Sequence, residues 1–258
     1  MRGIITAFRT LTIIPLPGPD AADMAQALPY FPLAGAALGG IVAVAAWAVS
    51  AKLGLTIIAG ALGCALAALL TRGLHLDGRG DAADAIGGGH TRERRLEIMK
   101  DPHIGAFGVI AIATVLLLKA AAITELASMT AWRWIAVAFV ISRTIQVELV
   151  VALPYARREG GTAGPFVQNA KPLHLAVATV LAAACCVAFA GLAALAVLAA
   201  ALVAAVAWIA WMKAAFGGVT GDLIGMASEI SETLLLVILA AAGPLLCDVF
   251  GLLVGIVD

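Results

Sequence analysis

Long apolar stretches alternate with short polar segments along this chain. Seven apolar runs approach or reach the length needed to cross a bilayer, because a span takes about 20 residues. The runs cover residues 32–51, 55–71, 104–124, 132–153, 174–194, 197–215 and 234–257. Continuous runs predict helices, whereas a β-barrel would alternate apolar and polar positions. The pattern therefore predicts an all-α, polytopic transmembrane helix bundle of about seven spans.

The fifth and sixth runs form one nearly unbroken stretch. At about 1.5 Å per residue, a single helix over 174–215 would overshoot a hydrocarbon core about 30 Å thick. We therefore predict a break near Gly191. The many Ala and Gly residues favour close helix packing, and we expect one integral membrane domain over residues 1–258.

The composition agrees with this pattern. Hydrophobic residues make up 63% of the 258 residues and charged residues only 12%. A soluble domain has about 45–50% apolar residues, so the excess indicates a membrane protein in contact with lipid. The formal net charge is zero, which argues against a nucleic-acid partner.

The Lys and Arg residues predict the orientation. If the N-terminus is cytoplasmic, twelve of them lie on the inner side, while Lys52, Lys119 and Arg133 lie toward the outer side. Positive residues favour the cytoplasmic side. The polar segments 72–103, 154–173 and 216–233 then share the cytoplasmic face, and we expect Lys119 to reach outward along its helix.

The segment 72–108 concentrates the charge, with six basic and six acidic side chains. Asp77, Asp81 and Asp84 are spaced i, i+4, i+7 and fall within about 60° of one helix face. Carboxylates so close repel each other, and Mg²⁺, which prefers carboxylate oxygens and substrate phosphates, would offset the repulsion. The alternative is a solvated helix whose acids pair with Arg72 and Arg79.

The second half of this segment, TRERRLEIMKD, predicts a short helix capped by Thr91 and ended by Asp101-Pro102. The Gly87–Gly89 connection would let it fold back over the first half. Taken alone, it is equally well explained as a solvated helix.

A second polar segment, GGVTGDLIGMASEISE at 217–232, carries three acids and no base. Asp222 and Glu229 are spaced i, i+7 and share a helix face, with Glu232 one turn further. This segment is either the second half of a site or an acidic loop at the interface. Arg143 lies within an apolar run, where a charge needs a partner, so we predict that it binds a phosphate or a carboxylate.

Clustered carboxylates with interspersed arginines suggest phosphoryl-group transfer. The strings HLDGRGDAADAIGGG, RRLEIMKDPHIGAFGV, FRTLTIIPLP, LPYARREGG and GGVTGDLIGMASEISE closely resemble the cobalamin synthase family, also called adenosylcobinamide-GDP ribazoletransferases. The resemblance extends from near the N-terminus to past Glu232. One departure is the polar surroundings of Arg79, where the family leads us to expect an apolar residue.

The resemblance implies a multi-pass enzyme of the bacterial inner membrane that acts late in vitamin B12 synthesis. It would join α-ribazole, or its 5′-phosphate, to adenosylcobinamide-GDP and release GMP, with Mg²⁺ as cofactor. On this chemistry we expect Asp77, Asp81 and Asp84 to hold the metal and Asp81, Asp84 and Lys100 to be catalytic, with Asp84 favoured as the base. We expect Arg72, Arg143, Asp222 and Glu229 to bind substrate. The choice between ribazole and its phosphate stays open, as does a homo-oligomer.

Two other functions stay open as alternatives. A CDP-alcohol phosphotransferase uses similar acidic residues, but this chain has DGRGDAADA and lacks the Ala-Arg that follows the first Asp-Gly in that family. A transporter or channel would carry mid-membrane charges and repeat symmetry, whereas most acids here lie at the ends of apolar runs.

Overall fold

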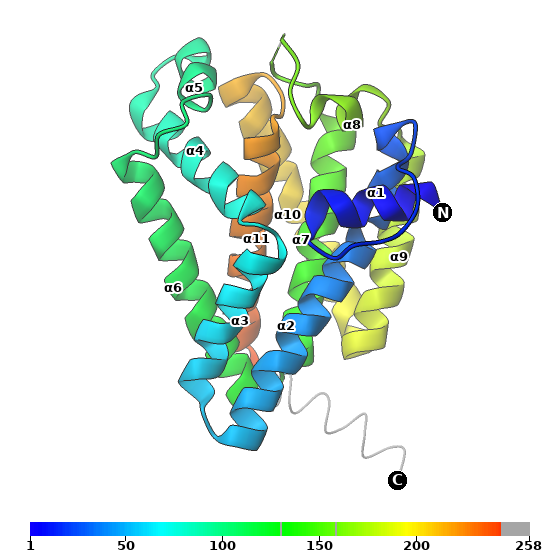
Figure 1. Cartoon of the computed structure of the whole chain (residues 1–258), viewed down its shortest axis with the longest axis vertical. Coiled ribbons are helices and arrows are strands. Elements are labelled where there is room, and N and C mark those ends of the chain that lie inside the picture. Colours follow the sequence, from blue (N-terminus) through cyan, green and yellow to red (C-terminus); the bar gives the residue numbers. More distant parts are fainter. Residues whose placement is uncertain (130, 158, 244–258) are drawn as a thin grey trace.

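The computed structural model is all-helical over the residues that it describes, 1–129, 131–157 and 159–243. Helices run roughly along the long axis of the molecule, and α1 (Arg2–Leu11) crosses them near one end (Figure 1). The longer helices have these bounds: α2 Phe31–Leu53, α3 Thr56–Leu70, α4 Leu74–Gly88, α6 Ala106–Ser128, α7 Arg133–Ala152, α9 Pro172–Ala190, α10 Ala193–Phe216 and α11 Gly221–Ala241. Three short helices complete the fold: the 3₁₀ helix η1 Met24–Tyr30, α5 Arg92–Ile98 and α8 Gly164–Gln168.

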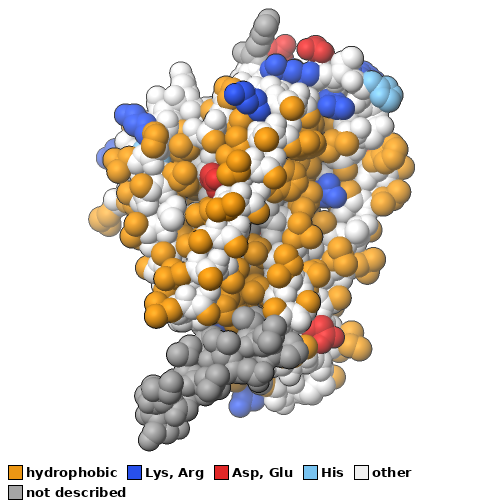
Figure 2. All heavy atoms as spheres, turned by 180° about the vertical axis from the view of Figure 1, so that it is seen from behind, with side chains coloured by type: hydrophobic (Ala, Val, Ile, Leu, Met, Phe, Trp, Pro, Cys, Tyr) orange, Lys and Arg blue, Asp and Glu red, His pale blue; other side chains and the backbone are white. Residues whose placement is uncertain are grey.

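Among the described residues, six helical segments are long and apolar enough to cross a membrane, and a seventh is counted if α3 and α4 form one bent span. This agrees with the prediction of about seven spans. Apolar side chains cover most of the flank seen in Figure 2, and charged side chains gather mainly at one end. The chain is therefore a multi-pass membrane protein.

The predicted break between the fifth and sixth runs is confirmed. Helix α9 ends at Ala190 and α10 begins at Ala193. Gly191 between them has φ of +70°, in the left-handed region that only glycine adopts readily. The break keeps each helix short enough for one crossing.

The second run, 55–71, forms helix α3 (Thr56–Leu70) but does not reach the length of a full span by itself. Helix α3 has only 15 residues, and the chain turns by 89° before α4 continues toward the polar end (Figure 1). Arg72 and Gly73 form the bend with φ of +55° and +68°. A non-glycine residue with positive φ is uncommon and strained, so Arg72 is held by its surroundings.

The last span begins earlier in the chain than the predicted run, 234–257. Most of the polar segment 217–232 is helical, because α11 begins at Gly221 and continues to Ala241. Of the run 234–257, residues 244–257 lie outside the described residues. Helix α11 packs against α4, α6 and α7, so its acidic residues face the bundle interior.

The polar connections lie together as expected. The α4–α6 connection with α5, the α7–α9 connection with α8, and the α10–α11 turn are all at the upper end in Figure 1. Helix α7, which is buried over most of its length, forms the centre of the bundle. This polar end contains the candidate site.

Candidate active site

Helices α4 and α11 bring the two acidic segments together. The two backbones approach closely at Gly78, where an added Cβ would lie 2.8 Å from both the Cα and the carbonyl oxygen of Asp222. Any larger residue at position 78 would separate the helices. The close approach brings Asp222 near Asp77 and Asp81, whose carboxylates all act electrostatically on one another. The sequence prediction that 217–232 forms the second half of the site is supported by this packing.

Among the described residues, Asp222 forms an ion pair with one basic side chain, Arg157. Arg157 donates from Nη2 to its Oδ2 at 2.6 Å, and both side chains are about one-fifth exposed. The hydroxyl of Thr220, which caps α11, is 3.3 Å from the same oxygen. Arg157 also donates to the carbonyl of Met99, at 3.3 Å. The guanidinium thus links the loop after α7, the end of α5 and the start of α11.

A short backbone pairing holds Arg157 in place. The amide of Ala156 donates to the carbonyl of Val219 at 2.8 Å, and the amide of Val219 donates to the carbonyl of Pro154 at 2.9 Å. These bonds tie the loop after α7 to the α10–α11 turn. From the sequence, Arg157 served only to predict the orientation in the membrane. Its position in the LPYARREGG string, which carries part of the family resemblance, was the signal that could have identified it as a site residue.

Helix α5 folds back against α4, the first half of the charged segment, as predicted. Thr91 caps it by accepting from the amide of Arg94. Arg95 donates to the carbonyl of Gly89 at 2.8 Å and to the carbonyl of Ala215, near the end of α10, at 3.4 Å. Because helix C-termini carry partial negative charge, the second contact favours a cation. These bonds place α5 above the Arg157–Asp222 pair.

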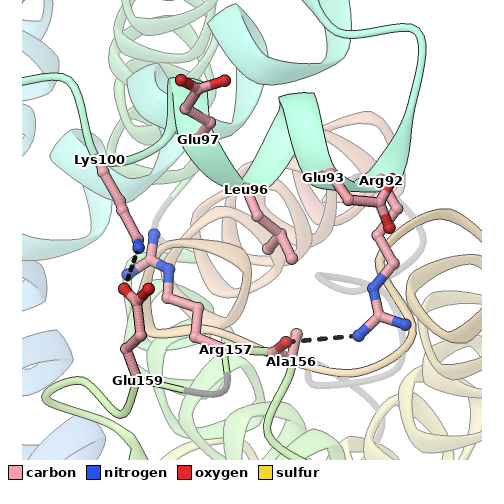
Figure 3. Close-up of a pocket in the computed structure, with 8 residues that line it drawn as sticks. All are labelled: Arg92, Glu93, Leu96, Glu97, Lys100, Ala156, Arg157 and Glu159. Atoms are coloured by element: carbon pink, nitrogen blue, oxygen red, sulfur yellow. Dashed lines mark hydrogen bonds and ion pairs between the residues drawn. The ribbon is translucent and has the colours of Figure 1, made fainter.

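Lys100 follows α5 and lies at the rim of the site. It forms an ion pair of 2.5 Å with Glu159 (Figure 3), and the two side chains are 49% and 80% exposed. The hydrogen bond and the charge from Lys100 lower the pKa of the Glu159 carboxyl. The predicted catalytic Lys100 is therefore near the site but engaged with a surface carboxylate.

Asp84 does not join the other carboxylates in a metal cluster. Its two oxygens accept hydrogen bonds from the amides of Gly105, at 2.7 Å, and Gly108, at 2.9 Å. Gly105 is the N-cap of α6, and a carboxylate there satisfies free amides and the positive end of the helix dipole. This contact does not support the predicted roles of Asp84 as metal ligand and base.

Arg143 and Glu229 belong to a separate buried network in the bundle interior. Arg143 donates from Nη1 to Glu232 at 2.8 Å and to the hydroxyls of Ser142 and Ser228. Lys119 pairs with both Glu229 and Glu232. All four charged side chains are at most 5% exposed. We predicted that Arg143 binds a phosphate or a carboxylate. It binds a carboxylate, and that carboxylate belongs to Glu232 of the same chain.

The predicted orientation of the Lys119 side chain is wrong. We expected it to reach outward, yet it is 2% exposed and pairs with two carboxylates of α11, Glu229 and Glu232. A charge within a span needs a partner, and the partner lies more than a hundred residues further along the chain. Both Arg143 and Glu229 are already paired within this network. The substrate-binding roles that we expected for them stay predictions.

Arg72 remains open to a ligand. Its guanidinium donates to the carbonyl of Arg9 at 2.9 Å, and it forms no ion pair with any described residue. It lines a cavity of about 320 Å³ together with Asp77 and Asp222. The predicted substrate-binding residues Arg72 and Asp222 are therefore brought together, whereas Arg143 and Glu229 lie apart from them.

The carboxylates of the site are suitable metal ligands, but they do not form a complete coordination site by themselves. Among the residues that the structure describes, no three Asp, Glu, His or Cys side chains are grouped as metal ligands. Mg²⁺ commonly uses one or two carboxylates and completes its shell with water and substrate phosphates. Asp77 and Asp81, with neither an ion pair nor a hydrogen bond from any described side chain, fit that pattern.

Comparisons with known proteins agree with this arrangement. The family model described as cobalamin-5-phosphate synthase matches residues 3–240. A curated adenosylcobinamide-GDP ribazoletransferase of Pelodictyon phaeoclathratiforme is 46% identical, over 94% of this chain and 97% of its own. Proteins of the same name from Chlorobium phaeovibrioides and Syntrophobacter fumaroxidans are 41% and 39% identical, over 90% and 91% of this chain and 94% and 95% of theirs.

No solved structure matches this chain significantly. The family match covers both acidic segments, the α5 region and the Arg157 loop. It therefore argues against the phosphotransferase and transporter alternatives. The chain belongs to the cobalamin-5-phosphate synthase family of membrane-bound transferases.

Proposed function

We propose that this chain joins α-ribazole, or its 5′-phosphate, to adenosylcobinamide-GDP and releases GMP. Near-complete alignment with curated proteins of that name supports the assignment. The observation that carries it is the meeting of Asp77, Asp81 and Asp222 at the packed faces of α4 and α11. The three carboxylates offer oxygen ligands for a metal cation. The guanidinium of Arg157, which is paired with Asp222, offers a positive charge for a phosphate.

Asp77 and Asp81 would hold Mg²⁺ on this proposal. A bound Mg²⁺ would neutralise the diphosphate and stabilise the leaving phosphate. Their spacing of one helical turn directs both carboxylates to one side of α4. The lack of a third preformed ligand leaves coordination positions for substrate phosphates.

Arg157 would bind the diphosphate of the donor. A guanidinium binds phosphate oxygens through two parallel hydrogen bonds, and this one is already fixed by two backbone bonds in its loop. When Arg157 turns from Asp222 to the phosphate, Asp222 loses its ion pair. Asp222 would then accept the proton of the attacking ribazole hydroxyl, in place of Asp84.

The transfer assay tests this function. Purified protein in detergent receives adenosylcobinamide-GDP, α-ribazole and Mg²⁺, and the joined corrinoid and GMP are measured by mass spectrometry. We expect equal amounts of both products, loss of both with a chelator, and recovery on returning Mg²⁺. Absence of the joined corrinoid under all conditions would contradict the proposed function.

We also propose that the protein lies in the bacterial inner membrane with the site facing the cytoplasm. The excess of Lys and Arg at the polar end supports this orientation. Exposed apolar residues along the bundle flank, such as Ile57, Leu117 and Val203, support contact with lipid.

Cysteine labelling tests the orientation. Single cysteines at the exposed positions His90 and Thr162, at the polar end, should react with an impermeant maleimide only in inverted vesicles. A cysteine at Lys52, at the opposite end, should react in intact cells. The unsubstituted protein controls for the native cysteines, and the reverse pattern would contradict the orientation.

A further inference from the structure

Two cavities adjoin the ion pair between Arg157 and Asp222. Arg157 lines one of about 450 Å³ beneath α5, which we call the α5 cavity (Figure 3). Asp222 lines the other, of about 320 Å³ between α1, the start of α2, α4, α7, α8 and α11, which we call the α8 cavity. The ion pair therefore stands between the two spaces.

The α5 cavity is lined mainly by charged side chains. Arg92, Lys100 and Arg157 supply the cations, and Glu93, Glu97 and Glu159 supply carboxylates (Figure 3). It lies at the polar end of the molecule, where a charged molecule can exchange with water. Such a lining suits a hydrophilic anion whose polar groups need both donors and acceptors.

The α8 cavity has a different lining. The rings of Phe31 and Phe166 lie in its wall, with centroids 5.9 Å apart in an edge-to-face contact. Leu11, Val150 and Ile224 add aliphatic surface. A buried polar pair, His75 and Gln146 with their nitrogens 2.7 Å apart, lies in the same wall. Four charged side chains also line this cavity, Arg9, Arg72, Asp77 and Asp222. Largely apolar walls with a few placed polar or charged groups are typical of small-molecule pockets.

The two exchanging groups of the proposed reaction differ in the same way. The acceptor is a nucleoside with a flat, methylated bicyclic base, whereas the departing group is a nucleoside monophosphate with a polar base. A cavity of about 320 Å³ is at the lower end of the range for small ligands, about 300–1,000 Å³. It suits a nucleoside and is too small for a corrinoid ring system.

We propose that the acceptor's base occupies the α8 cavity and that the guanosine phosphate occupies the α5 cavity, so that the two approach Arg157 and Asp222 from opposite sides. This inference rests on the proposed function. Phosphoryl transfer places the attacking and leaving oxygens roughly in line across the phosphorus. Because Arg157 borders one cavity and its partner Asp222 borders the other, the two cavities are compatible with that geometry.

The bond changes balance with this placement. The ribose hydroxyl oxygen forms the new bond to the cobinamide-linked phosphorus, and its proton goes to Asp222. The bond from that phosphorus to the bridging oxygen breaks, and GMP leaves with the electron pair into the α5 cavity. The corrinoid stays outside both cavities, attached to the phosphorus throughout.

Steady-state kinetics with each substrate varied in turn test the proposal. Phe166→Ala should raise KM for α-ribazole about tenfold, which corresponds to about 1.4 kcal/mol, and leave KM for adenosylcobinamide-GDP within twofold. Glu93→Ala should raise KM for the donor and weaken inhibition by GMP, with KM for α-ribazole unchanged. The exposed side chain of Glu93 forms no ion pair or hydrogen bond with another described side chain, so its loss should leave the fold intact.

A specificity readout separates base recognition from a loss of folding. Wild type should prefer α-ribazole over an imidazole ribonucleoside, and Phe166→Ala should reduce that preference. Phe166→Leu keeps most of the apolar volume and should show a preference between those of wild type and Phe166→Ala. It replaces Phe166→Ala in the test if that variant does not fold. The same readout should not change in Glu93→Ala.

The outcomes are distinguishable. Wild-type protein that makes no joined corrinoid at all contradicts the proposed function. Wild-type activity with a crossed pattern, in which Phe166 variants raise the donor KM and Glu93→Ala raises the acceptor KM, overturns only the cavity assignment. An unchanged base preference in both Phe166 variants also overturns it.

Discussion

Arg157 Nη2 lies 2.6 Å from Asp222 Oδ2, and this ion pair joins the loop after α7 to the first turn of α11. The two residues are 65 positions apart in the sequence. The loop is fixed to the α10–α11 turn by backbone bonds on either side of Tyr155. The pair therefore connects the loop after α7 to the part of α11 that packs against α4 at Gly78.

Replacement of Arg157 should affect transfer more than stability. Arg157→Ala removes the proposed phosphate ligand, and loss of one such preorganised group typically lowers kcat by about 10²–10³. Arg157→Lys should recover part of the rate, because it keeps the charge without the two-pronged geometry. Arg94→Ala, an exposed residue of α5 paired with Glu97, is the matched control and should keep wild-type kinetics. Equal loss in both alanine variants would argue against a specific role.

Asp84→Asn should lower stability more than activity. An amide replaces one of the two acceptor oxygens that bind the Gly105 and Gly108 amides and removes the charge at the start of α6. Loss of a helix cap costs about 0.5–2 kcal/mol, which a thermal unfolding curve in detergent detects. Transfer per folded molecule should stay within a few-fold of wild type. An unchanged unfolding temperature with abolished transfer would restore Asp84 to the metal site or to the base role.

Gly78→Ala should separate α4 from α11. The added methyl would lie 2.8 Å from the Asp222 backbone, closer than non-bonded atoms allow, and overpacking typically costs about 1–3 kcal/mol. We expect a lower unfolding temperature and reduced transfer, because Asp222 moves relative to Asp77 and Asp81. Gly88→Ala is the control on the same helix, since its Cβ would meet Ile98 at an ordinary 3.4 Å. Similar behaviour of the two variants would contradict the packing argument.

Lys119→Met should strongly destabilise the protein. It leaves Glu229 and Glu232 buried with Arg143 as the remaining cation, and breaking a buried ion pair typically costs about 3–5 kcal/mol. The double variant Lys119→Met/Glu229→Gln restores charge balance and should recover part of the folded yield, measured by size-exclusion chromatography in detergent. A stable Lys119→Met protein that loses only substrate affinity would instead favour a binding role for this network.

Much of the fold follows from apolar run lengths. The break at Gly191 is predictable because an unbroken helix would exceed the bilayer thickness. The bend at Arg72 and Gly73 is not, since hydropathy is insensitive to backbone dihedral angles. Thr91 is recognisable as a cap because its partner lies three residues away.

The site was predictable only where local spacing carries the information. The helical face shared by Asp77 and Asp81 follows from periodicity. Asp84 shares that spacing, yet its partners come from the start of α6, and Lys119 finds its partners on α11. Such long-range pairings depend on how the helices pack, which spacing along one helix does not reveal.

The central claim is that the carboxylates of α4 support metal-dependent transfer. Transfer by purified Asp81→Asn protein, matched to wild type for folding, tests it most directly across a Mg²⁺ titration. We expect wild type to form cobalamin product and GMP in a Mg²⁺-dependent manner, while Asp81→Asn forms neither at any Mg²⁺ concentration. Near-normal product formation by Asp81→Asn at the wild-type Mg²⁺ requirement would contradict it.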